Sequence, residues 1–389
     1  MNLGFYYHIP IHSTGEGLKI PAYLGVFLDS LANEVGTLTL FMHEANPHDA
    51  LHCDYILKSK NIRYVSLGIK SAAWDRFLWP GKTLSKIKEQ VSTCDTLLVR
   101  APSPLAPAFY DQFCKLTKVA FLVVGDYNEG AKHLDQPWWR KIPISILSKR
   151  NDRQLSLVLN RSLTLVNSTA LFNKYKSKVK NLHEVKTTTL SSNDFFERTN
   201  TCEGNEIKIL YAGGLYLAKG LIEFLEAGSI VIHKFKNVSL HFVGGDYTEG
   251  EQIKILLKER AKGLGIEQQV TFHGYKTTGA DLNNIYRMAD IYAIPSFHEG
   301  FPRTIWEAMA NSLPVIATKV GSIPFFLESG TNALLIEPKN IKQLAESIEL
   351  IINNPDLRKK LIHNGFLLAK ENTLELQTRK IVQFLKLHN

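Results

Sequence analysis

The sequence predicts an α/β protein of two domains, each built on a parallel β-sheet with helices on both faces. Short apolar segments alternate with longer amphipathic segments, and the alternation stops once, at a polar stretch, before it resumes. Alternation of strand and helix is typical of parallel sheets whose crossover helices cover both faces. A length of 389 residues exceeds one ordinary core and suits two domains.

The expected strands fall into two groups, and helical segments lie between several of them, as at 18–34 and 103–117. The first group is 3–9, 37–42, 63–67, 96–100, 119–124 and 163–167. The second is 207–212, 238–243, 269–274, 290–295, 313–318 and 332–337, and helices are expected from about 340 to 387.

The polar stretch 191–206 is rich in Ser, Asn, Thr and Glu and is predicted to be an interdomain linker. It separates an N-terminal domain, 1–190, from a C-terminal domain, 207–371, which the segment 372–389 follows. Ligands of parallel α/β sheets bind beyond the carboxyl ends of the strands. We therefore expect the two sheets to face each other across a ligand-binding cleft.

The composition is that of an ordinary globular protein, with 44% hydrophobic and 21% charged residues. The first 17 residues lack the basic and apolar regions of a signal peptide, and the longest apolar runs, such as 119–124, are too short to span a bilayer. We therefore expect a cytoplasmic protein. The four cysteines show no CxxC spacing, which favours reduced thiols: Cys53, Cys94, Cys114 and Cys202.

The net charge of +9 is concentrated in residues 1–200, which hold 25 Lys and Arg against 17 Asp and Glu. This asymmetry favours an anionic partner: a membrane surface, a phosphate-bearing substrate or nucleic acid. Segments 74–91 and 136–163 mix aromatic and basic residues, which suits peripheral docking on an anionic bilayer, although a solvated basic face around core tryptophans explains them equally well. No recognised nucleic-acid-binding motif is present. The residues concerned are Trp74, Trp79, Trp138 and Trp139 with Arg76, Lys82, Arg140 and Lys141.

The segment EGFPRTIWE, residues 299–307, places a carboxylate in the loop after a buried strand. Pro302 is expected as the first helical residue, since its missing N–H would be unpaired there. The amides of Gly300, Phe301 and Arg303 then lie at a helix N-terminus, which favours a phosphate. Glu299, before this helix, can accept hydrogen bonds from sugar hydroxyls.

Glu307 lies deeper on the same helix and can accept hydrogen bonds from a ribose. One short element can thus hold both sugars of a nucleotide-sugar with the diphosphate between them. The alternative is that Glu299 and Glu307 are solvated helix charges.

Glycines follow several predicted strands. Gly213 and Gly214 allow a tight exit from a strand, and Lys219 can then bring its ammonium group to a diphosphate. Gly244 follows the next strand, where a plain turn is an equal explanation. Gly15 and Gly17 suggest a phosphate-cradling loop, although two spaced glycines are weak evidence.

The C-terminal half resembles the large bacterial family of retaining glycosyltransferases with the GT-B fold of two Rossmann-like domains, also called group 1 or family 4-like. The match runs from Ala289 to Thr318 and includes the Glu-x7-Glu element. The family's phosphate-binding loop is matched at 214–220, and its base pocket at Gly244 and Gly274.

The resemblance implies transfer of a sugar with retention from a nucleotide-sugar, a UDP- or GDP-sugar, to a lipid-linked or polysaccharide acceptor. Glu299 would contact the donor sugar, Glu307 the ribose and Lys219 the leaving diphosphate. No separate cofactor and no metal is expected, and no Asp-x-Asp is present. The family also returns its last helix to the N-terminal domain, which fits the apolar stripe of Ile381, Phe384 and Leu385.

Two positions depart from the family pattern. Gly214 stands where the family has an arginine, and Gly125 where it often has a histidine. Asp126 is our candidate for the histidine's role, with Glu129, His8 and His12 as alternatives. These departures keep two other functions open, a catalytically reduced nucleotide-sugar-binding or partner protein and a nucleotide-sugar epimerase of the same fold.

Overall fold

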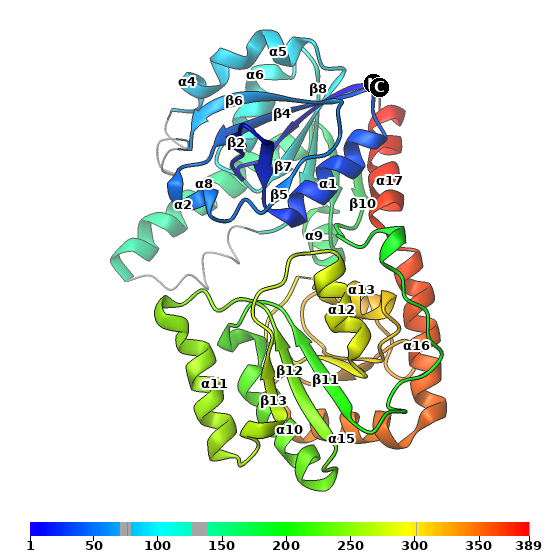
Figure 1. Cartoon of the computed structure of the whole chain (residues 1–389). Coiled ribbons are helices and arrows are strands. Elements are labelled where there is room, and N and C mark those ends of the chain that lie inside the picture. The colour runs from blue at the N-terminus through cyan, green and yellow to red at the C-terminus, as the bar shows by residue number, and fades with distance from the viewer. Residues whose placement is uncertain (71–75, 77–78, 127–137, 301, 389) are drawn as a thin grey trace. The chain divides into compact units, whose positions relative to one another are not determined.

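The computed structural model describes residues 1–70, 76, 79–126, 138–300 and 302–388, and for 138–144 the backbone only. The chain forms two compact units (Figure 1). Unit 1 comprises Met1–Thr187 and Leu374–Asn389, and unit 2 comprises Thr188–Thr373.

Unit 1 is built on a seven-stranded sheet in the order β10-β9-β8-β7-β1-β4-β6, in which every neighbouring pair is parallel. β1 lies near the middle, and Tyr6 pairs with Phe41 of β4 and with Val99 of β7. The strands are β1 (Asn2–Tyr6), β4 (Thr37–Glu44), β6 (Ile62–Ile69), β7 (Thr96–Ala101), β8 (Lys118–Val123), β9 (Leu163–Val166) and β10 (Leu182–Glu184).

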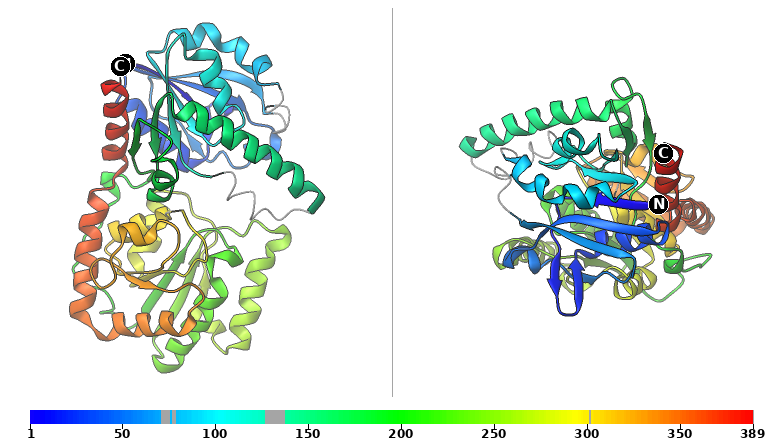
Figure 2. Two further views of the ribbon diagram at one scale, coloured as in Figure 1. Left: turned by 180° about the vertical axis from the view of Figure 1, so that it is seen from behind. Right: turned by 90° about the horizontal axis from the view of Figure 1, so that it is seen from above.

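Each face of this sheet carries its own apolar core. On one face, α1 (Ala22–Asn33) and α17 (Leu374–Leu387) pack over the sheet, and on the other face α6 (Ala106–Phe113) and α8 (Trp138–Leu159) do so, as Figure 2 shows from behind. The remaining helices of unit 1 are α2 (Pro47–Ala50), α4 (Pro80–Leu84), α5 (Lys88–Ser92) and α9 (Thr169–Tyr175). Both faces are therefore covered, as in a doubly wound sheet.

A small antiparallel sheet of β2 (His12–Thr14), β3 (Gly17–Ile20) and β5 (Tyr55–Ile56) also belongs to unit 1. The prediction of a helix from residue 18 is wrong, because Leu18 and Lys19 pair with Ser13 and His12 in a hairpin. Helix α1 begins only at Ala22, after Pro21.

Unit 2 has a six-stranded sheet in the order β13-β12-β11-β14-β15-β16, also parallel throughout. The strands are β11 (Ile207–Ala212), β12 (Val238–Val243), β13 (Val270–Phe272), β14 (Ile291–Ile294), β15 (Val315–Thr318) and β16 (Leu334–Ile336). Its helices are α10 (Leu221–Lys234), α11 (Gln252–Gly263), α12 (Ala280–Met288), α13 (Arg303–Ala310), α14 (Ile323–Phe326), α15 (Ile341–Asn353) and α16 (Pro355–Lys370).

Residues 191–206 are part of unit 2, whose first residue is Thr188, and do not form a separate linker. Hydrogen bonds hold this polar segment on the unit, because it has few apolar residues to bury. The Arg198 guanidinium donates to the carbonyl oxygens of Arg287 and Ala289, over 3.2 and 2.6 Å. The Cys202 amide donates to Asp290 over 2.8 Å.

Helix α17 is a structural part of unit 1 although it lies at the end of the chain. Ile381 and Leu385 are buried in the core that α1 shares with the sheet, and Phe384 packs at its margin. A buried hydrogen bond of 2.8 Å joins the hydroxyls of Ser30 on α1 and Thr378 on α17.

We predict that Ile381→Ala lowers the free energy of unfolding by about 2–5 kcal/mol, because it leaves a cavity in a close-packed core. Leu387→Ala is the matched control on the same helix, since Leu387 is 79% exposed. Denaturation followed by circular dichroism measures both variants. Equal, small losses for the two variants would show that α17 does not contribute to the core.

Candidate functional site

The carboxyl edge of the unit 2 sheet is formed by glycines in backbone contact. The Gly213 amide donates to Val243 O and the Gly244 amide to Gly274 O, both over 2.9 Å. Gly244 has a φ of 143°, and a Cβ there would lie 1.8 Å from Gly213 O. The ends of β11, β12 and β13 therefore meet so closely that only glycine fits at 244.

A second close contact joins the loop after β11 to the loop after β14. Gly220 has a φ of 70°, and a Cβ there would lie 2.1 Å from Pro295 O. The Phe297 amide donates to Ala218 O over 2.9 Å. This contact brings Lys219, the last residue of a short 3-10 helix, beside the loop that carries Glu299.

Lys219 and Glu299 form an ion pair with 2.5 Å between Nζ and Oε1. The hydroxyl of Ser296 donates to the same carboxylate oxygen over 2.8 Å. Below the pair, the Tyr211 hydroxyl donates to Gly214 O over 2.9 Å. Burial, and then the charge of Glu299, raises the pKa of Tyr211 well above its usual value, so this hydroxyl keeps its proton. The arrangement offers a cation and a carboxylate side by side.

Helix α13 presents its N-terminus to the same edge. It begins at Arg303 with Pro302 as its N-cap, so the expectation that Pro302 is the first helical residue is wrong by one position. Among the described residues no side chain caps this end, and amides at a helix N-terminus can donate hydrogen bonds to an anionic ligand. Gly300 is held by a 2.7 Å hydrogen bond from the Ser322 amide to its carbonyl oxygen. Phe301 lies outside the described residues.

Gly321 supports the Glu299 loop from the other side. Its φ is 56°, and a Cβ there would lie 1.8 Å from Glu299 O. The backbone that carries Glu299 and Gly300 is therefore fixed before any ligand arrives.

Glu307 is buried, with 8% of its surface exposed, and both carboxylate oxygens accept protein hydroxyls. Thr189 donates to Oε1 and Tyr286 to Oε2, each over 2.9 Å. Glu307 therefore ties α13 to α12 and to the first residues of unit 2. Thr189 and Tyr286 could not be predicted as partners of Glu307, because they lie 118 and 21 positions away from it. Ser296 lies only three positions before Glu299, but a serine in a loop is too common to signal the contact.

The candidate residues fall into two groups by unit. The carboxyl edge of the unit 2 sheet gathers those of the C-terminal half: Gly213, Gly214, Lys219, Gly244, Gly274, Glu299, Gly300, Arg303 and Glu307. The others, Gly15, Gly17 and Asp126, belong to unit 1.

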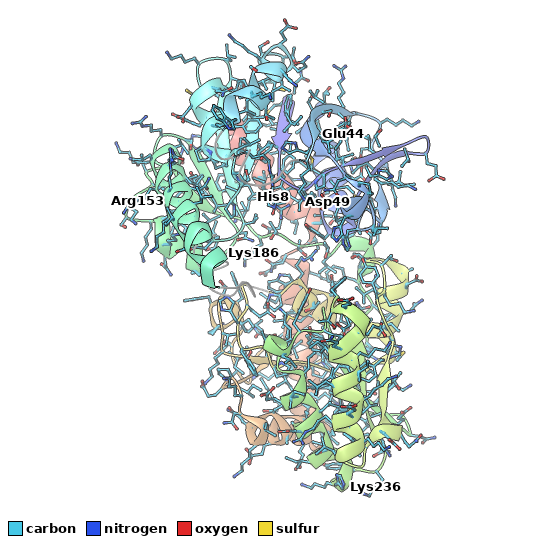
Figure 3. All side chains as sticks on the ribbon, turned by 90° about the vertical axis from the view of Figure 1, so that its left-hand side faces the viewer. His8, Glu44, Asp49, Arg153, Lys186 and Lys236 are labelled. Carbon is cyan, nitrogen blue, oxygen red and sulfur yellow. The ribbon has the colours of Figure 1, made fainter. Side chains whose placement is uncertain are left out.

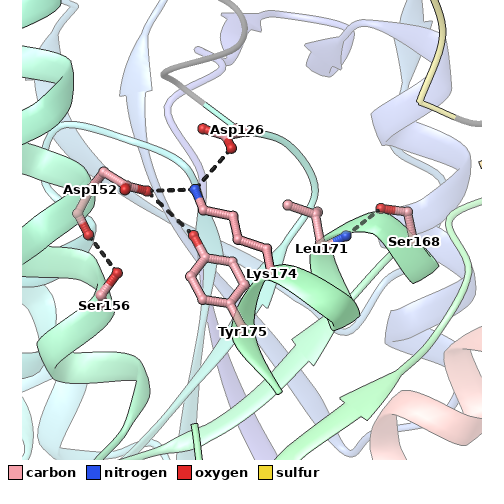
Figure 4. Close-up of polar contacts among 7 residues, drawn as sticks. All are labelled: Asp126, Asp152, Ser156, Ser168, Leu171, Lys174 and Tyr175. Atoms are coloured by element: carbon pink, nitrogen blue, oxygen red, sulfur yellow. Dashed lines mark hydrogen bonds and ion pairs between the residues drawn. The ribbon is translucent and has the colours of Figure 1, made fainter. Parts of the chain in front are cut away.

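Asp126 follows β8 and is held in an ionic network (Figure 4). Lys174 Nζ lies 2.8 Å from Asp126 Oδ2 and 2.9 Å from Asp152 Oδ1. The Tyr175 hydroxyl also donates to Asp152, over 3.4 Å. Hydrogen bonds to both carboxylates outweigh burial and raise the pKa of Lys174, so the cation persists and orients Asp126.

Gly15 and Gly17 lie at the tip of the β2–β3 hairpin, where Thr14 pairs with Gly17. The expectation that a helix directly follows these glycines is wrong, since β3 and Pro21 separate them from α1. Glu129 lies outside the described residues.

Only part of the predicted lipid-binding face can be placed. Trp79 is 69% exposed, whereas Arg76 is 6% exposed and cannot lie on a membrane-contacting surface. Trp74 lies outside the described residues, as do the side chains of Trp138, Trp139, Arg140 and Lys141. In the part of the chain that the structure describes, no helix is both long and apolar enough to cross a bilayer.

The architecture is that of a GT-B glycosyltransferase. The crystal structure of Anabaena Alr3699/HepE in complex with UDP matches with a TM-score of 0.74 and 17% identity over 99% of this chain and 100% of that one. The family described as glycosyl transferases group 1 matches residues 192–367.

Two relatives from Staphylococcus aureus extend the comparison. Protein CapJ is 30% identical over 75% of this chain and 70% of its own length. The capsular polysaccharide biosynthesis glycosyltransferase CapM is 26% identical over 45% of this chain and 44% of its own. The chain spans less than half the length of several other curated relatives that it matches. It belongs to the group 1 glycosyltransferase family.

We predict that Gly244→Ala lowers the free energy of unfolding by about 2–5 kcal/mol, from left-handed backbone strain and overpacking against Gly213. Gly250→Ala is the control: its φ is also positive, 72°, but nothing lies within 4 Å of a Cβ there. Its loss should be only about 1–2 kcal/mol. Chemical denaturation compares them, and equal losses would contradict the close contact.

Proposed function

We propose that the chain transfers a glycosyl group, with retention, from a nucleotide-sugar to a saccharide acceptor. The observation that carries the proposal is the Lys219–Glu299 ion pair beside the uncapped N-terminus of α13. A cation and the N-terminus of a helix suit a diphosphate, and a carboxylate suits sugar hydroxyls.

The reaction places its main electrostatic demand on the leaving group. The bond between the anomeric carbon and the diphosphate oxygen breaks, and a bond to the acceptor oxygen forms on the same face. The acceptor's proton passes to the leaving phosphate. Lys219 and the amides of α13 stabilise the negative charge that develops on the diphosphate, so no metal is required.

Glu299 has a second role, because it holds Lys219 while the site is empty. Donor binding exchanges this ion pair: the ammonium group turns to the diphosphate, and the carboxylate becomes free to accept hydrogen bonds from the donor sugar. The pair is partly exposed, with 27% of the Lys219 side chain and 10% of the Glu299 side chain accessible, so the exchange needs no unfolding.

The donor is a UDP- or GDP-sugar, with UDP favoured because HepE is described in complexes with UDP and with UDP-glucose. The acceptor is a polysaccharide or a lipid-linked saccharide, which the name of the relative CapM supports.

A second candidate function is binding of a nucleotide-sugar without transfer. It is favoured by Gly214, where a Cβ would lie 2.6 Å from the ring of Tyr216. Tyr216 thus fills the space that the family's arginine side chain would enter, and the site has one cation fewer for the diphosphate.

Incubation with UDP-, GDP- and ADP-sugars and saccharide acceptors tests both candidates. Release of nucleoside diphosphate only when an acceptor is present supports transfer, whereas an altered sugar without acceptor indicates an epimerase. A thermal-shift screen shows which nucleotide binds, since a ligand at 100 times its dissociation constant adds roughly 2.7 kcal/mol. Binding without product would favour the second candidate.

We predict that Glu299→Ala lowers turnover at least tenfold while UDP or GDP still binds, since this carboxylate contacts the sugar and not the nucleotide. Glu328→Ala, at an exposed position of the same unit, is the control. Steady-state kinetics and calorimetry measure the two effects. Loss of nucleotide binding as severe as the loss of turnover would refute the assigned role.

We predict that Glu307→Gln weakens nucleotide binding by about tenfold to a hundredfold, because bonds from a ribose to a charged acceptor contribute roughly 1.5–3 kcal/mol. Tyr286→Phe is the matched control, since it removes a hydroxyl that Glu307 binds and leaves the carboxylate. Calorimetric titration with the nucleotide measures the affinity of both variants. Equal affinities of Glu307→Gln and the wild type would reduce Glu307 to a purely structural residue.

We also propose that the protein docks peripherally on the inner face of a cell membrane through segments 74–91 and 136–163, which presents a lipid-linked acceptor to the enzyme. The excess charge of residues 1–200 and the exposed Trp79 support this. Each basic residue near an anionic surface contributes about 1 kcal/mol, within a Debye length.

Vesicle co-sedimentation should therefore increase with anionic lipid and decrease with salt. Replacing Arg140 and Lys141 by Glu should weaken it, whereas the same change at Lys359 and Lys360, exposed on unit 2, should have little effect. Negligible binding to anionic vesicles at low salt would rule the docking out.

A further inference from the structure

Five basic side chains gather at the carboxyl edge of the unit 1 sheet. His8 follows β1, and β1 lies between β4, which carries His43, and β7, which carries Arg100. Figure 3 labels His8 on this unit. Lys70 follows β6, the neighbour of β4, and Arg76 comes a few residues later. We call His8, His43, Lys70, Arg76 and Arg100 the cationic cluster.

The cluster contains buried polar atoms that have no hydrogen-bond partner in the part of the chain that the structure describes. Arg76 is 6% exposed, and its Nε and Nη1 have no hydrogen-bond partner among the described residues. His43 is 2% exposed; its Nδ1 lies 3.2 Å from Gly68 O, while its Nε2 has no partner there. The Nδ1 of His8 is likewise buried without a partner. Unpaired polar groups at such depth are rare in folded proteins and call for a ligand or a strained function.

The acidic groups nearest in sequence are already engaged. Asp49 pairs with Lys70 over 3.0 Å, and Glu44 accepts a hydrogen bond from the Ser66 hydroxyl over 2.7 Å. Arg100 lies over the rings of Tyr7 and Phe27, with 4.6 and 5.6 Å to their centroids. The positive charge of Arg76 thus has no carboxylate partner in the described structure, which is costly for a buried ion.

Burial first, and then the neighbouring positive charges, lower the pKa of both histidines. Burial, then Arg76, Lys70 and Arg100, lowers the pKa of His8 to about 3. Burial and Arg76 lower the pKa of His43 to about 4, and the hydrogen bond that its Nδ1 donates to Gly68 O only partly opposes them. Both imidazoles are therefore neutral at neutral pH, and an incoming anion would relieve the repulsion.

We propose that the cationic cluster is a phosphate-binding subsite, which takes a phosphate ester carried by the acceptor. The cluster lies at the edge where parallel α/β sheets bind their ligands. The charges of Arg76 and Arg100, with Lys70 beside them and the buried His8 Nδ1 as a further possible donor, favour a dianion over a carboxylate. The assignment of the phosphate to an acceptor rests on the proposed function, because the donor site lies in unit 2.

The effect of Arg76 on stability distinguishes a binding role from a purely structural one. A structural arginine would be held by carboxylates or carbonyls, and its removal would destabilise the fold. A buried arginine that binds a ligand but has no partner in the protein lowers the stability of the unliganded protein. We therefore expect Arg76→Gln to leave the melting temperature unchanged or to raise it, with Arg63→Gln, at an exposed position of β6, as the control.

The test is titration of the full chain with methyl phosphate and, separately, with acetate, followed through the imidazole NMR resonances of His8 and His43. Methyl phosphate should shift both and bind at least tenfold more weakly to Arg76→Gln, while Arg63→Gln binds as the wild type does. Equal binding of methyl phosphate to Arg76→Gln and to the wild type, or a lower melting temperature of the unliganded variant, would overturn the proposal. Tighter binding of acetate than of methyl phosphate would overturn the choice of phosphate.

Two further experiments are needed. The first distinguishes a lipid headgroup from a soluble phosphate ester, and the second tests the proposed donor site separately from the phosphate subsite. Binding to phosphatidic acid vesicles that Arg76→Gln weakens would assign the phosphate to a lipid headgroup, and vesicle binding that it leaves unchanged would assign it to a soluble ester. UDP is titrated in parallel. Phosphate binding without UDP binding would contradict the donor site of unit 2 and leave the subsite of unit 1 standing.

Discussion

The close backbone packing around the Glu299 loop is the constraint on which the unit 2 site depends. Gly220 lies against Pro295 O, and Gly321 lies against Glu299 O. A Cβ atom at either glycine would overlap the facing carbonyl oxygen. Because neither loop can move away, Lys219 and Glu299 are held within 2.5 Å of each other before a substrate binds. In the part of the chain that the structure describes, no side chain caps the N-terminus of α13 near this loop.

Local pattern was sufficient for the fold class and for most strands, because buried parallel strands are continuous apolar runs bounded by turns. The predicted strands 207–212 and 238–243 coincide with β11 and β12. The hairpin at 12–20 was missed because Gly17 to Ile20 adjoin a true helix, and the apolar pattern of α1 was extended backward across Pro21. The stretch 191–206 looked like a linker because it is polar, but polar residues such as Arg198 attach through hydrogen bonds that composition does not reveal.

The candidate site was predictable only where it lies in one continuous segment. The strand, the loop and the helix around Glu299 follow one another in sequence, so the helix N-terminus could be anticipated to within one residue. Contacts between distant segments were not accessible. Thr189 reaches Glu307 from 118 positions away, and Lys219 reaches Glu299 from 80. Such pairs depend on the strand order, in which β11 lies beside β14, and no spacing rule encodes it.

The lysines considered in the two units are paired with carboxylates, whereas the buried Arg76 of unit 1 is not. In unit 2 the Lys219 ammonium group and the Glu299 carboxylate neutralise each other. In unit 1 the Lys174 ammonium group is likewise neutralised, because it pairs with the carboxylates of Asp126 and Asp152. The buried Arg76 has no such partner among the described residues. A buried charge without a partner is costly, and a paired or apolar residue would be more stable there. Arg76 is therefore the position in unit 1 where stability and ligand binding should oppose each other most directly.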